Sequence, residues 1–494
     1  MRLSELLADE YPAPPDIEVT GLALNSADVR PGYGFFALAG FKQDGLRYGG
    51  QALANGAAVV MYDPEASDPA LIGEAANVHS SRVYLPLAGL AAKVGELAAR
   101  FYGRPSEKMA VIGVTGTNGK STCTHLLAQC LPDCGVAGTL GWGRLPDLTP
   151  LVNTTPDALT MQSILADFYA RGLKIAAIEA SSHGLAQGRL RGVRFAGAVF
   201  TNLSRDHLDY HASMDEYFRA KSLLFTQPDL PFAVINLDDA HGARLPGILP
   251  VGARCLTYSC AGARTAGAEA VCAEDARFTP EGAHFNAVWN GQAVPAFIPL
   301  LGEFNLQNAL AALAVMLALG VELPEAAARL ARARPCQGRM EMLGGGPQPL
   351  VIVDYAHTPD ALAKTLRAIR HAGALTVVFG CGGDRDAGKR PLMGEIAESY
   401  ADRVILTDDN PRSEAAENII QDILAGCRSA QVMHDRALAI AEAIAAAAAG
   451  DVVLIAGKGH EQYQEIKGQK FPFSDQEAAR RALAAWSEHH EIKI

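Results

Sequence analysis

The chain has 494 residues and a formal net charge of -11, and 49% of its residues are hydrophobic while 20% are charged. This composition is typical of a globular protein with ample core, and the length predicts about three domains. The negative charge argues against a nucleic acid as partner, because binding a phosphate backbone requires a basic surface.

Neither a membrane segment nor an oxidising compartment is expected. No stretch is apolar and long enough to cross a bilayer, and acidic residues interrupt the apolar part of residues 1–10, so these do not form a signal peptide. The nine cysteines lack paired C-x-x-C spacing, and the closest two, Cys130 and Cys134, are interpreted as core thiols. We expect a cytoplasmic enzyme that does not insert into membranes and that acts as a monomer.

Three segments of different character follow one another along the chain. Residues 1–104 combine short strands with glycine-rich loops and end in an amphipathic helix over 87–101. Residues 105–333 alternate strands with helices, and residues 334–494 repeat this alternation, which predicts an α/β fold with parallel sheets covered by helices. The main strands are expected at 109–114, 175–179, 198–202, 232–236, 350–354, 375–380, 404–407 and 451–456, and a helix is expected to end at Ala449 before Gly450.

The most informative segment is residues 109–122, where a buried strand breaks at Gly116 and Gly119 and a helix starts at Lys120. This order is a variant of the phosphate-binding loop. The glycines allow backbone N–H groups to turn toward phosphate oxygens, the helix N-terminus adds positive potential, Lys120 supplies a point charge and Ser121 can hold Mg²⁺. The alternative is an ordinary strand-to-helix turn. The arrival of strand, glycines, lysine, hydroxyl and helix in the required order favours a nucleoside triphosphate site.

Polar residues follow two further strands. Ligands gather at the carboxyl ends of parallel strands, so we expect Glu179 to lie near Ser121 and to share its Mg²⁺, although it could simply be an exposed residue at a strand end. The next strand opens into residues 203–211, whose Asp and His residues suit a second cation or a substrate phosphate. Lys221 follows in a helical pattern over 214–225, where a lysine is more often a snorkelling surface residue. The pattern alone does not select Lys221.

Five segments in this order resemble the Mur ligase family of peptidoglycan synthesis over essentially the whole chain: residues 116–121, 179–184, 201–211, 302–308 and 354–360. The resemblance implies three domains. Residues 1–104 would form a smaller α/β domain that binds the UDP-sugar, residues 105–333 a central ATP-binding P-loop domain with a parallel sheet, and residues 334–494 a Rossmann-like domain that binds an amino acid.

The resemblance also assigns an ATP site and a metal site. Ser121 and Glu179 would bind one Mg²⁺ and His207 a second, and Lys221 would offer Mg²⁺ an oxygen of the carbamate that it forms with CO₂. The carbamate has a physical reason, because an ammonium repels Mg²⁺ whereas a carbamate offers it an anionic oxygen. The residues assigned to ATP are Gly116, Thr117, Asn118, Gly119, Lys120, Ser121, Thr122, Asn308, Arg339 and Asp354.

Two further sites follow from the same resemblance. The UDP-MurNAc-dipeptide would contact Leu24, Ser26, the loop from Gly40 to Gly45, Asn153, Thr154, Thr155, Ser181, Gln187 and Arg189. Residues 41–43 depart from the His-containing loop of relatives. meso-Diaminopimelate would contact Arg385, Asp409, Asn410, Pro411, Arg412, Gly457 and Glu461. Arg412 suits this role because a guanidinium binds the extra carboxylate with two parallel hydrogen bonds, although residues 409–412 taken alone read as a turn.

The implied reaction is ATP-dependent addition of meso-diaminopimelate to UDP-MurNAc-L-Ala-D-Glu through an acyl phosphate. One alternative within the class is the same ligase adding L-lysine, which Arg412 argues against. A second is a folylpolyglutamate-synthase-like ligase, which should lack the N-terminal nucleotide domain. From another class, the chain could be a P-loop NTPase that acts as a switch.

Overall fold

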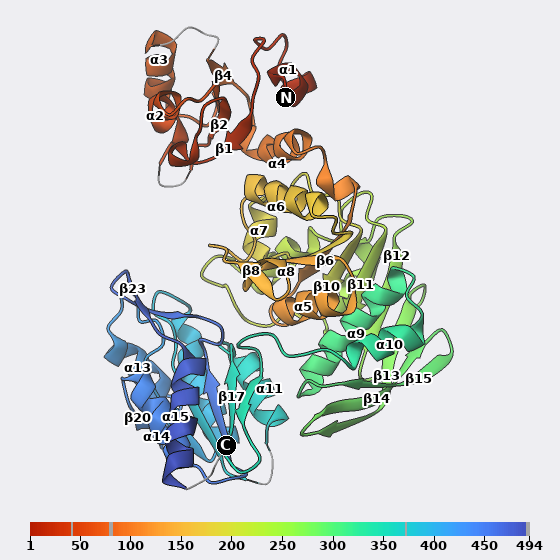
Figure 1. Cartoon of the computed structure of the whole chain (residues 1–494), viewed down its shortest axis with the longest axis vertical. Helices are drawn as coiled ribbons and strands as arrows, with labels where there is room; N and C mark the ends of the chain where they lie inside the picture. The colour runs from red at the N-terminus through yellow and green to blue at the C-terminus, as the bar shows by residue number, and fades with distance from the viewer. Residues whose placement is uncertain (41–42, 79–82, 371–372, 491–494) are drawn as a thin grey trace. The chain divides into compact units, whose positions relative to one another are not determined.

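The computed structural model describes residues 1–40, 43–78, 83–370 and 373–490 (Figure 1). The chain forms two compact units. The first contains residues 1–113, 133–197 and 227–230, and the second contains residues 114–132, 198–226 and 231–494. The division falls inside strand β5 (Ala110–Thr115), directly before the glycine-rich loop.

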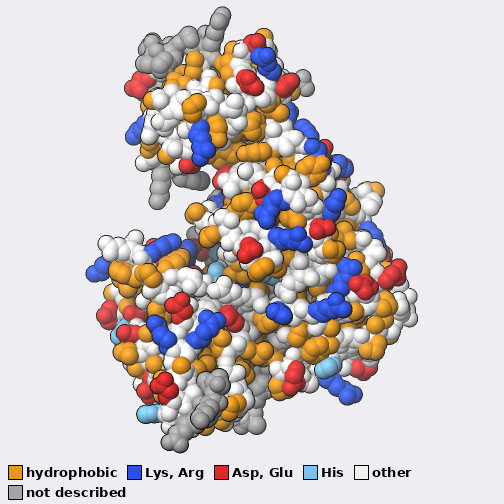
Figure 2. All heavy atoms as spheres, in the orientation of Figure 1, with side chains coloured by type: hydrophobic (Ala, Val, Ile, Leu, Met, Phe, Trp, Pro, Cys, Tyr) orange, Lys and Arg blue, Asp and Glu red, His pale blue; other side chains and the backbone are white. Residues whose placement is uncertain are grey.

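The surface carries charges of both signs. Figure 2 shows Lys and Arg side chains interspersed with Asp and Glu over the face that it draws. Within the described ranges, no helix is both long and apolar enough to cross a membrane.

A four-stranded parallel sheet in the order β1-β2-β3-β4 begins the first unit. Its elements are β1 (Gly21–Ala23), β2 (Tyr33–Ala37), β3 (Val59–Tyr62), β4 (Tyr84–Pro86), α1 (Leu3–Leu7), α2 (Gly49–Ala54), α3 (Pro69–Val78) and α4 (Leu90–Phe101). Successive side chains of a strand point to opposite faces. Phe36 and Met61 therefore pack with the leucines of α1 and α4, whereas Phe35 and Val60 pack on the other face with Ala52 of α2.

The rest of the first unit carries four strands in the order β9-β6-β7-β8. Its elements are β6 (Cys134–Gly138), β7 (Gly141–Arg144), β8 (Asp147–Thr149), β9 (Ile175–Glu179), α6 (Ala158–Ala170) and α7 (Ser182–Ala186). Strand β6 is parallel to β9 and antiparallel to β7. Helix α6 buries Phe168 against β6, and Gly135 leaves room for that ring, since a Cβ there would lie 2.8 Å from it.

The first sheet of the second unit runs in the order β15-β14-β13-β12-β11-β10. Its strands are β10 (Gly197–Phe200), β11 (Phe232–Asn236), β12 (Arg254–Ser259), β13 (Glu269–Thr279), β14 (Gly282–Trp289) and β15 (Gln292–Ile298). The accompanying helices are α5 (Lys120–Cys130), α8 (Met214–Ser222), α9 (Glu303–Ala318) and α10 (Leu323–Leu330). Helix α9 buries residues on all sides, as expected of a helix that is apolar all round.

The predicted parallel pairing is present in the central sheet, which in addition contains antiparallel strands that were not predicted. Strands β11, β12 and β13 are parallel, but β14 is antiparallel to both β13 and β15, and β7 is antiparallel to β6 and β8. The loop between β14 and β15 is Asn290-Gly291, with φ of 48° and 78°. Two residues with positive φ are the signature of a tight hairpin turn, whereas parallel strands need a long crossover. The Asn-Gly pair was therefore the overlooked signal.

The C-terminal sheet has the order β16-β17-β21-β18-β19-β20, parallel except for the edge strand β16. Its strands are β16 (Glu341–Gly344), β17 (Leu350–Asp354), β18 (Leu375–Phe379), β19 (Arg403–Leu406), β20 (Gln431–Val432) and β21 (Val452–Ala456). The helices are α11 (Pro359–Ala368), α12 (Arg390–Tyr400), α13 (Ala416–Leu424), α14 (Arg436–Ala445) and α15 (Asp475–His489). One core joins the sheet to α11, α12 and α13, and another joins it to α14 and α15. This doubly wound arrangement confirms the Rossmann-like prediction.

A short antiparallel hairpin, β22 (Tyr463–Ile466) and β23 (Gln469–Pro472), follows β21.

Most predicted strands lie within one residue of their observed ends, and the helix expected over 87–101 begins at Leu90. The helix expected to reach Ala449 is wrong at its end, because α14 stops at Ala445. There the Asp451 side chain accepts from the Ala448 amide and Trp486 donates to the Ala447 carbonyl, which replaces helical hydrogen bonds. Cys130 and Cys134 are buried free thiols, as predicted.

Candidate active site

The glycine-rich loop packs against Thr201, which directly follows β10. Gly116 has φ of 148° and Gly119 has φ of 87°, and a Cβ on Gly116 would lie 1.8 Å from Thr201 Oγ1. Thr201 Oγ1 donates to the Asn118 carbonyl at 2.6 Å. Only glycine allows both this backbone conformation and this approach.

Lys120 opens α5 and folds back over the loop. Its ammonium donates to the carbonyls of Gly116 and Thr117, both at 2.9 Å. A fixed cation therefore lies beside the N-terminus of α5, and the helix dipole at such an end favours an anion. This arrangement suits the predicted binding of a phosphate, which stays a prediction.

Lys221 in α8 is buried, with 1% of its surface exposed. Its ammonium donates to the Gly116 carbonyl at 2.8 Å and lies 4.4 Å from the centre of the Tyr217 ring. Burial, and then the charge of Lys120, hold the pKa of Lys221 well below its usual value, although Asp206 opposes them. The interpretation of Lys221 as a surface residue is thus wrong. Its periodicity places it on a helix, but only the folded chain shows which face is covered.

His207 lies next to the carboxylate of Asp206, which the sequence analysis included only as one of the Asp residues of 203–211. His207 has φ of 54°, and its Nε2 lies 3.4 Å from Asp206 Oδ2, while His357 Nε2 lies 3.8 Å from the same oxygen. Burial alone would raise the pKa of Asp206, but the hydrogen bond and charge of His357, with the charges of His207 and Lys389, lower it. Asp206 is therefore ionised, and its place directly before His207 was the available signal.

One pocket of the second unit contains six of the residues predicted to bind ATP. Its lining includes Asn118, Gly119, Thr122, Asn308, Arg339 and Asp354. A Cβ on Gly119 would lie 2.4 Å from Asn308 Oδ1, so α9 closely approaches the glycine-rich loop. The prediction that residues far apart in sequence meet at one nucleotide site agrees with this geometry.

Arg339 and Asp354 supply opposite charges to this pocket. The Arg339 guanidinium lies 4.4 Å from the centre of the Tyr355 ring, and its Nη2 is 3.4 Å from Ser121 Oγ. Asp354 accepts from the Met340 amide at 2.8 Å. Burial raises the pKa of Asp354, and Arg339 opposes that shift. Such a pair offers a cation to a phosphate and an acceptor to hydroxyl groups.

The first unit holds a second group of predicted residues around Glu179. The Glu179 carboxylate accepts from the amide and the hydroxyl of Thr139, at 2.9 and 3.1 Å. Thr155 Oγ1 donates to the Glu179 carbonyl at 2.7 Å and also contacts Ser181 Oγ at 2.9 Å. The other connected residues are Thr154, which contacts Thr139, Arg189, which donates to the Thr155 carbonyl, and Gln187, which accepts from Arg189. Asn153 is exposed beside them.

Glu179 belongs to the first unit and Ser121 to the second, so their sharing of one Mg²⁺ stays a prediction. The predicted uridine-diphosphate residues lie in the N-terminal sheet region. Leu24 packs against the core there, and Ser26 is buried and donates to Gln51 Oε1 at 3.0 Å. Residues 41 and 42 of the predicted loop lie outside the described residues.

Arg412 and Arg385 lie beside one backbone position of the C-terminal sheet, that of Gly382. A Cβ there would lie 2.8 Å from Arg412 Nη1 and 3.8 Å from Arg385 Cγ. Arg412 has φ of 51°, donates to the Gly383 carbonyl at 2.7 Å and lies 3.5 Å from Glu465. The two predicted cations therefore gather at the carboxyl end of β18, as expected of ligand residues in a doubly wound sheet.

The remaining predicted residues of this site form an acidic group. Asn410 Nδ2 donates to Glu461 Oε2 at 2.7 Å. Gly457 has φ of 111°, and a Cβ there would lie 2.6 Å from Asp409 Oδ2. Pro411 continues the turn, and its carbonyl accepts from the Glu414 amide at 3.0 Å. The turn interpretation of residues 409–412 and the site interpretation are therefore compatible.

Three family models match the chain. They are described as the Mur ligase family catalytic domain over residues 18–102, the Mur ligase middle domain over 114–316, and the Mur ligase glutamate ligase domain over 338–459.

Curated relatives match nearly the whole chain. A UDP-N-acetylmuramoyl-L-alanyl-D-glutamate–2,6-diaminopimelate ligase of Pseudomonas aeruginosa is 48% identical over 484 residues, which is 96% of this chain and 97% of the relative. An enzyme of the same name from Alkalilimnicola ehrlichii is 49% identical over 479 residues, 95% of each chain.

Solved structures agree. One of a ligase with the same name superposes with a TM-score of 0.70, at 38% identity and with 99% of each chain covered. MurF from Acinetobacter baumannii gives a TM-score of 0.66 at 19% identity and covers 95% of this chain and 94% of its own, which is a likeness of fold alone.

We predict that Gly116→Ala weakens binding of a non-hydrolysable ATP analogue by about 5- to 150-fold. A strained backbone and a displaced loop cost about 1–3 kcal/mol, and 1.4 kcal/mol corresponds to about tenfold in affinity. Isothermal titration calorimetry measures the effect. The matched control is Gly320→Ala, where φ is also positive at 86° but no atom lies within 4 Å of the added Cβ. An equal loss of affinity in both variants would show that the effect comes from backbone strain in general and not from the loop at Gly116.

Proposed function

Because the chain belongs to the Mur ligase family, we propose that it adds meso-2,6-diaminopimelate to UDP-MurNAc-L-Ala-D-Glu at the expense of ATP, in peptidoglycan precursor synthesis. The observation that carries this proposal is the identity of 44–49% over nearly the full length with enzymes of that name. The two arginines beside Gly382 support the choice of an amino acid with two carboxylates. L-Lysine, which has one carboxylate, would leave one cation without its partner.

The proposed domain boundaries are 1–104, 105–333 and 334–494. Each of the three matched ranges, 18–102, 114–316 and 338–459, falls inside one of them. The N-terminal domain would bind the UDP-sugar, the central domain ATP, and the C-terminal domain the amino acid. A folylpolyglutamate synthase of Mycobacterium tuberculosis is similar in fold, at 17% identity, and covers only 74% of this chain.

The first chemical step activates a carboxylate. An oxygen of the D-glutamyl side-chain carboxylate attacks the γ-phosphorus of ATP, the bond from that phosphorus to the β,γ-bridging oxygen breaks, and ADP leaves. Lys120 and the N-terminus of α5 stabilise the charge on the transferring phosphoryl group. Catalysis of this kind depends mainly on positioning and preorganised charge.

The second step forms the amide. The amino group of diaminopimelate attacks the acyl carbon, a tetrahedral intermediate forms, and the carbon–oxygen bond to phosphate breaks as the nitrogen loses its proton. Closure of the C-terminal domain over the central one would exclude water, which would otherwise hydrolyse the acyl phosphate.

The residues proposed to hold Mg²⁺ suit it chemically. Ser121 and Glu179 are buried oxygen donors, and hard cations prefer oxygen ligands. His207 would add a nitrogen ligand, and Lys221 an anionic oxygen as a carbamate. Lys221 fits that modification because it is buried with a lowered pKa, and only a neutral amine attacks CO₂. When bound, Mg²⁺ would neutralise charge on the ATP phosphates.

Release of inorganic phosphate from ATP tests the proposed function. We expect phosphate only when UDP-MurNAc-L-Ala-D-Glu and meso-diaminopimelate are both present, with little when L-lysine replaces diaminopimelate. A switch-type NTPase hydrolyses ATP without either compound. Phosphate release that is independent of both would therefore contradict the ligase assignment.

We predict that Lys221→Ala is nearly inactive and that formate or acetate partly restores its activity. These small carboxylates can supply the oxygen that the carbamate would present. The assay is phosphate release with and without each acid, and the control is Lys174→Ala, which removes an exposed lysine. Full activity of Lys221→Ala without added acid would disprove the carbamate role.

Arg412→Ala is expected to reduce kcat/KM for diaminopimelate by tens- to thousands-fold. Removing one partner of a buried charge pair costs about 2–5 kcal/mol, and each 1.4 kcal/mol is about tenfold. The values for ATP and the nucleotide dipeptide should barely change. L-Lysine should stay a poor substrate, because Arg385 remains.

Arg370→Ala is the control for Arg412→Ala, since Arg370 pairs with Asp402 at the other end of the strands, away from the predicted site. It should leave all three kcat/KM values unchanged. Equal losses for all three substrates in Arg412→Ala would show that Arg412 supports the fold and not the recognition of one carboxylate.

A further inference from the structure

Lys458, in the loop between β21 and β22, is fully buried, with 0% of its surface exposed. Sequence reasoning did not select it, although it lies between the predicted residues Gly457 and Glu461. A buried ammonium is costly unless its N–H groups are satisfied and its charge is balanced. The ammonium of Lys458 therefore requires acceptors and a negative charge close to it.

The hydrogen-bond and ion-pair partners of Lys458 all belong to the predicted amino-acid site. Its Nζ donates to Asn410 Oδ1 at 2.9 Å, lies 3.1 Å from Glu461 Oε2 and lies 4.0 Å from Asp409 Oδ1. Asn410 closes the group, because its Nδ2 donates to the same Glu461 oxygen at 2.7 Å. The backbone amide of Glu465 donates to Asn410 Oδ1 at 2.9 Å. Lys458 thus connects the turn after β19 with the loop after β21.

Both contacts that orient the Glu461 carboxylate within the described residues are made to Oε2. They leave Oε1 as the oxygen available to a substrate ammonium. The positive charge of Lys458 also offsets the repulsion between Glu461 and Asp409, which would otherwise push the two carboxylates apart.

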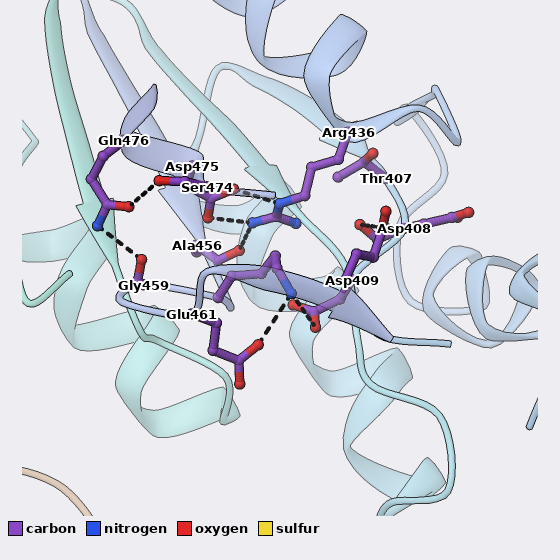
Figure 3. A network of polar contacts seen from close by, with 12 residues as sticks. Thr407, Asp408, Asp409, Arg436, Ala456, Gly459, Glu461, Ser474, Asp475 and Gln476 are labelled. Carbon is purple, nitrogen blue, oxygen red and sulfur yellow. Dashed lines mark hydrogen bonds and ion pairs between the residues drawn. The ribbon is translucent and has the colours of Figure 1, made fainter. Parts of the chain in front are cut away.

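The backbone of the same loop is held by residues of α14 and α15. Figure 3 shows Arg436 between the carboxylate of Asp475 and the carbonyl of Ala456, the residue before Gly457. Arg436 contacts both oxygens of Asp475, at 2.7 and 2.9 Å, and donates to the Ala456 carbonyl at 2.9 Å. Gln476 donates to the Gly459 carbonyl at 2.9 Å. These contacts hold the backbone of the loop without Lys458, whose own contacts are made to the side chains of Asn410 and Glu461.

We propose that Lys458 is a positioning residue for amino-acid recognition: its ammonium holds Glu461 and Asn410 in the arrangement that receives an ammonium group of the incoming amino acid. This inference rests on the proposed function and names a further determinant of the same site. Lys458 does not itself contact the reacting atoms.

The test measures kcat and KM for all three substrates in Lys458→Met and in Lys458→Gln, which is neutral but keeps a hydrogen-bond donor. We expect the KM for meso-diaminopimelate to rise at least tenfold in both variants. The KM values for ATP and the nucleotide dipeptide should stay within about twofold, and the thermal unfolding midpoint should stay near that of the wild type. The control is Arg370→Met, which removes the cation of an exposed pair and should change none of these values.

A double-mutant cycle with Glu461→Gln identifies the group through which Lys458 acts. If it acts through Glu461, adding Lys458→Met to Glu461→Gln raises the KM for diaminopimelate by no more than about twofold beyond Glu461→Gln alone. If the increases in KM caused by Lys458→Met and Glu461→Gln instead multiply in the double variant, the proposal is overturned. Unchanged KM values in both Lys458→Met and Lys458→Gln would also overturn it. Unfolding of both Lys458→Met and Lys458→Gln would also overturn it, because Lys458 would then be required for folding and not for substrate recognition.

These outcomes are distinct from a failure of the proposed function. A wild-type chain that shows no turnover dependent on diaminopimelate would contradict that function and this proposal together. Normal wild-type turnover with unchanged Lys458 variants would overturn only the role of Lys458.

Discussion

Two lysine ammonium groups donate to a single backbone oxygen, that of Gly116. Lys120 reaches it from the start of α5 at 2.9 Å, and Lys221 reaches it from α8 at 2.8 Å. Two like charges at such a short separation repel each other, and the buried one is the less stable. The loop therefore keeps Lys120 as the cation for phosphate and favours a neutral, reactive Lys221. Both consequences depend on the backbone conformation that glycine permits at position 116.

Charge of alternating sign organises the C-terminal site in a similar way. Arg385 and Arg412 gather beside Gly382, while Asp409 and Glu461 gather around Lys458. An amino acid with two carboxylates and two ammonium groups needs partners of both signs. Holding each group in place before the substrate arrives reduces the entropy lost on binding. Selectivity would then come from charges that are left unpaired when a smaller substrate binds.

Local signals in the sequence predicted much of this structure. The strand, glycines and helix of the phosphate loop are local, and so are the alternating elements of the C-terminal domain, which the structure confirms. The burial of Lys221 was not predictable in the same way, because Lys221 packs on Tyr217 and donates to a carbonyl 105 residues away in sequence. Lys458 was not predicted for the same reason, since its partners lie on other elements, whereas Asp206 was expected only as one of the acidic residues of 203–211. The antiparallel strands β14 and β15 were missed although Asn290-Gly291 was a local signal.

The central claim is that ATP activates the D-glutamyl side-chain carboxylate as an acyl phosphate. The most direct measurement starts from UDP-MurNAc-L-Ala-D-Glu labelled with ¹⁸O in that carboxylate and determines the isotope content of the released phosphate by mass spectrometry. Amide formation through an acyl phosphate transfers one labelled oxygen to each phosphate. Release of unlabelled phosphate alongside the amide product would mean that the phosphoryl group went to water and would contradict the account.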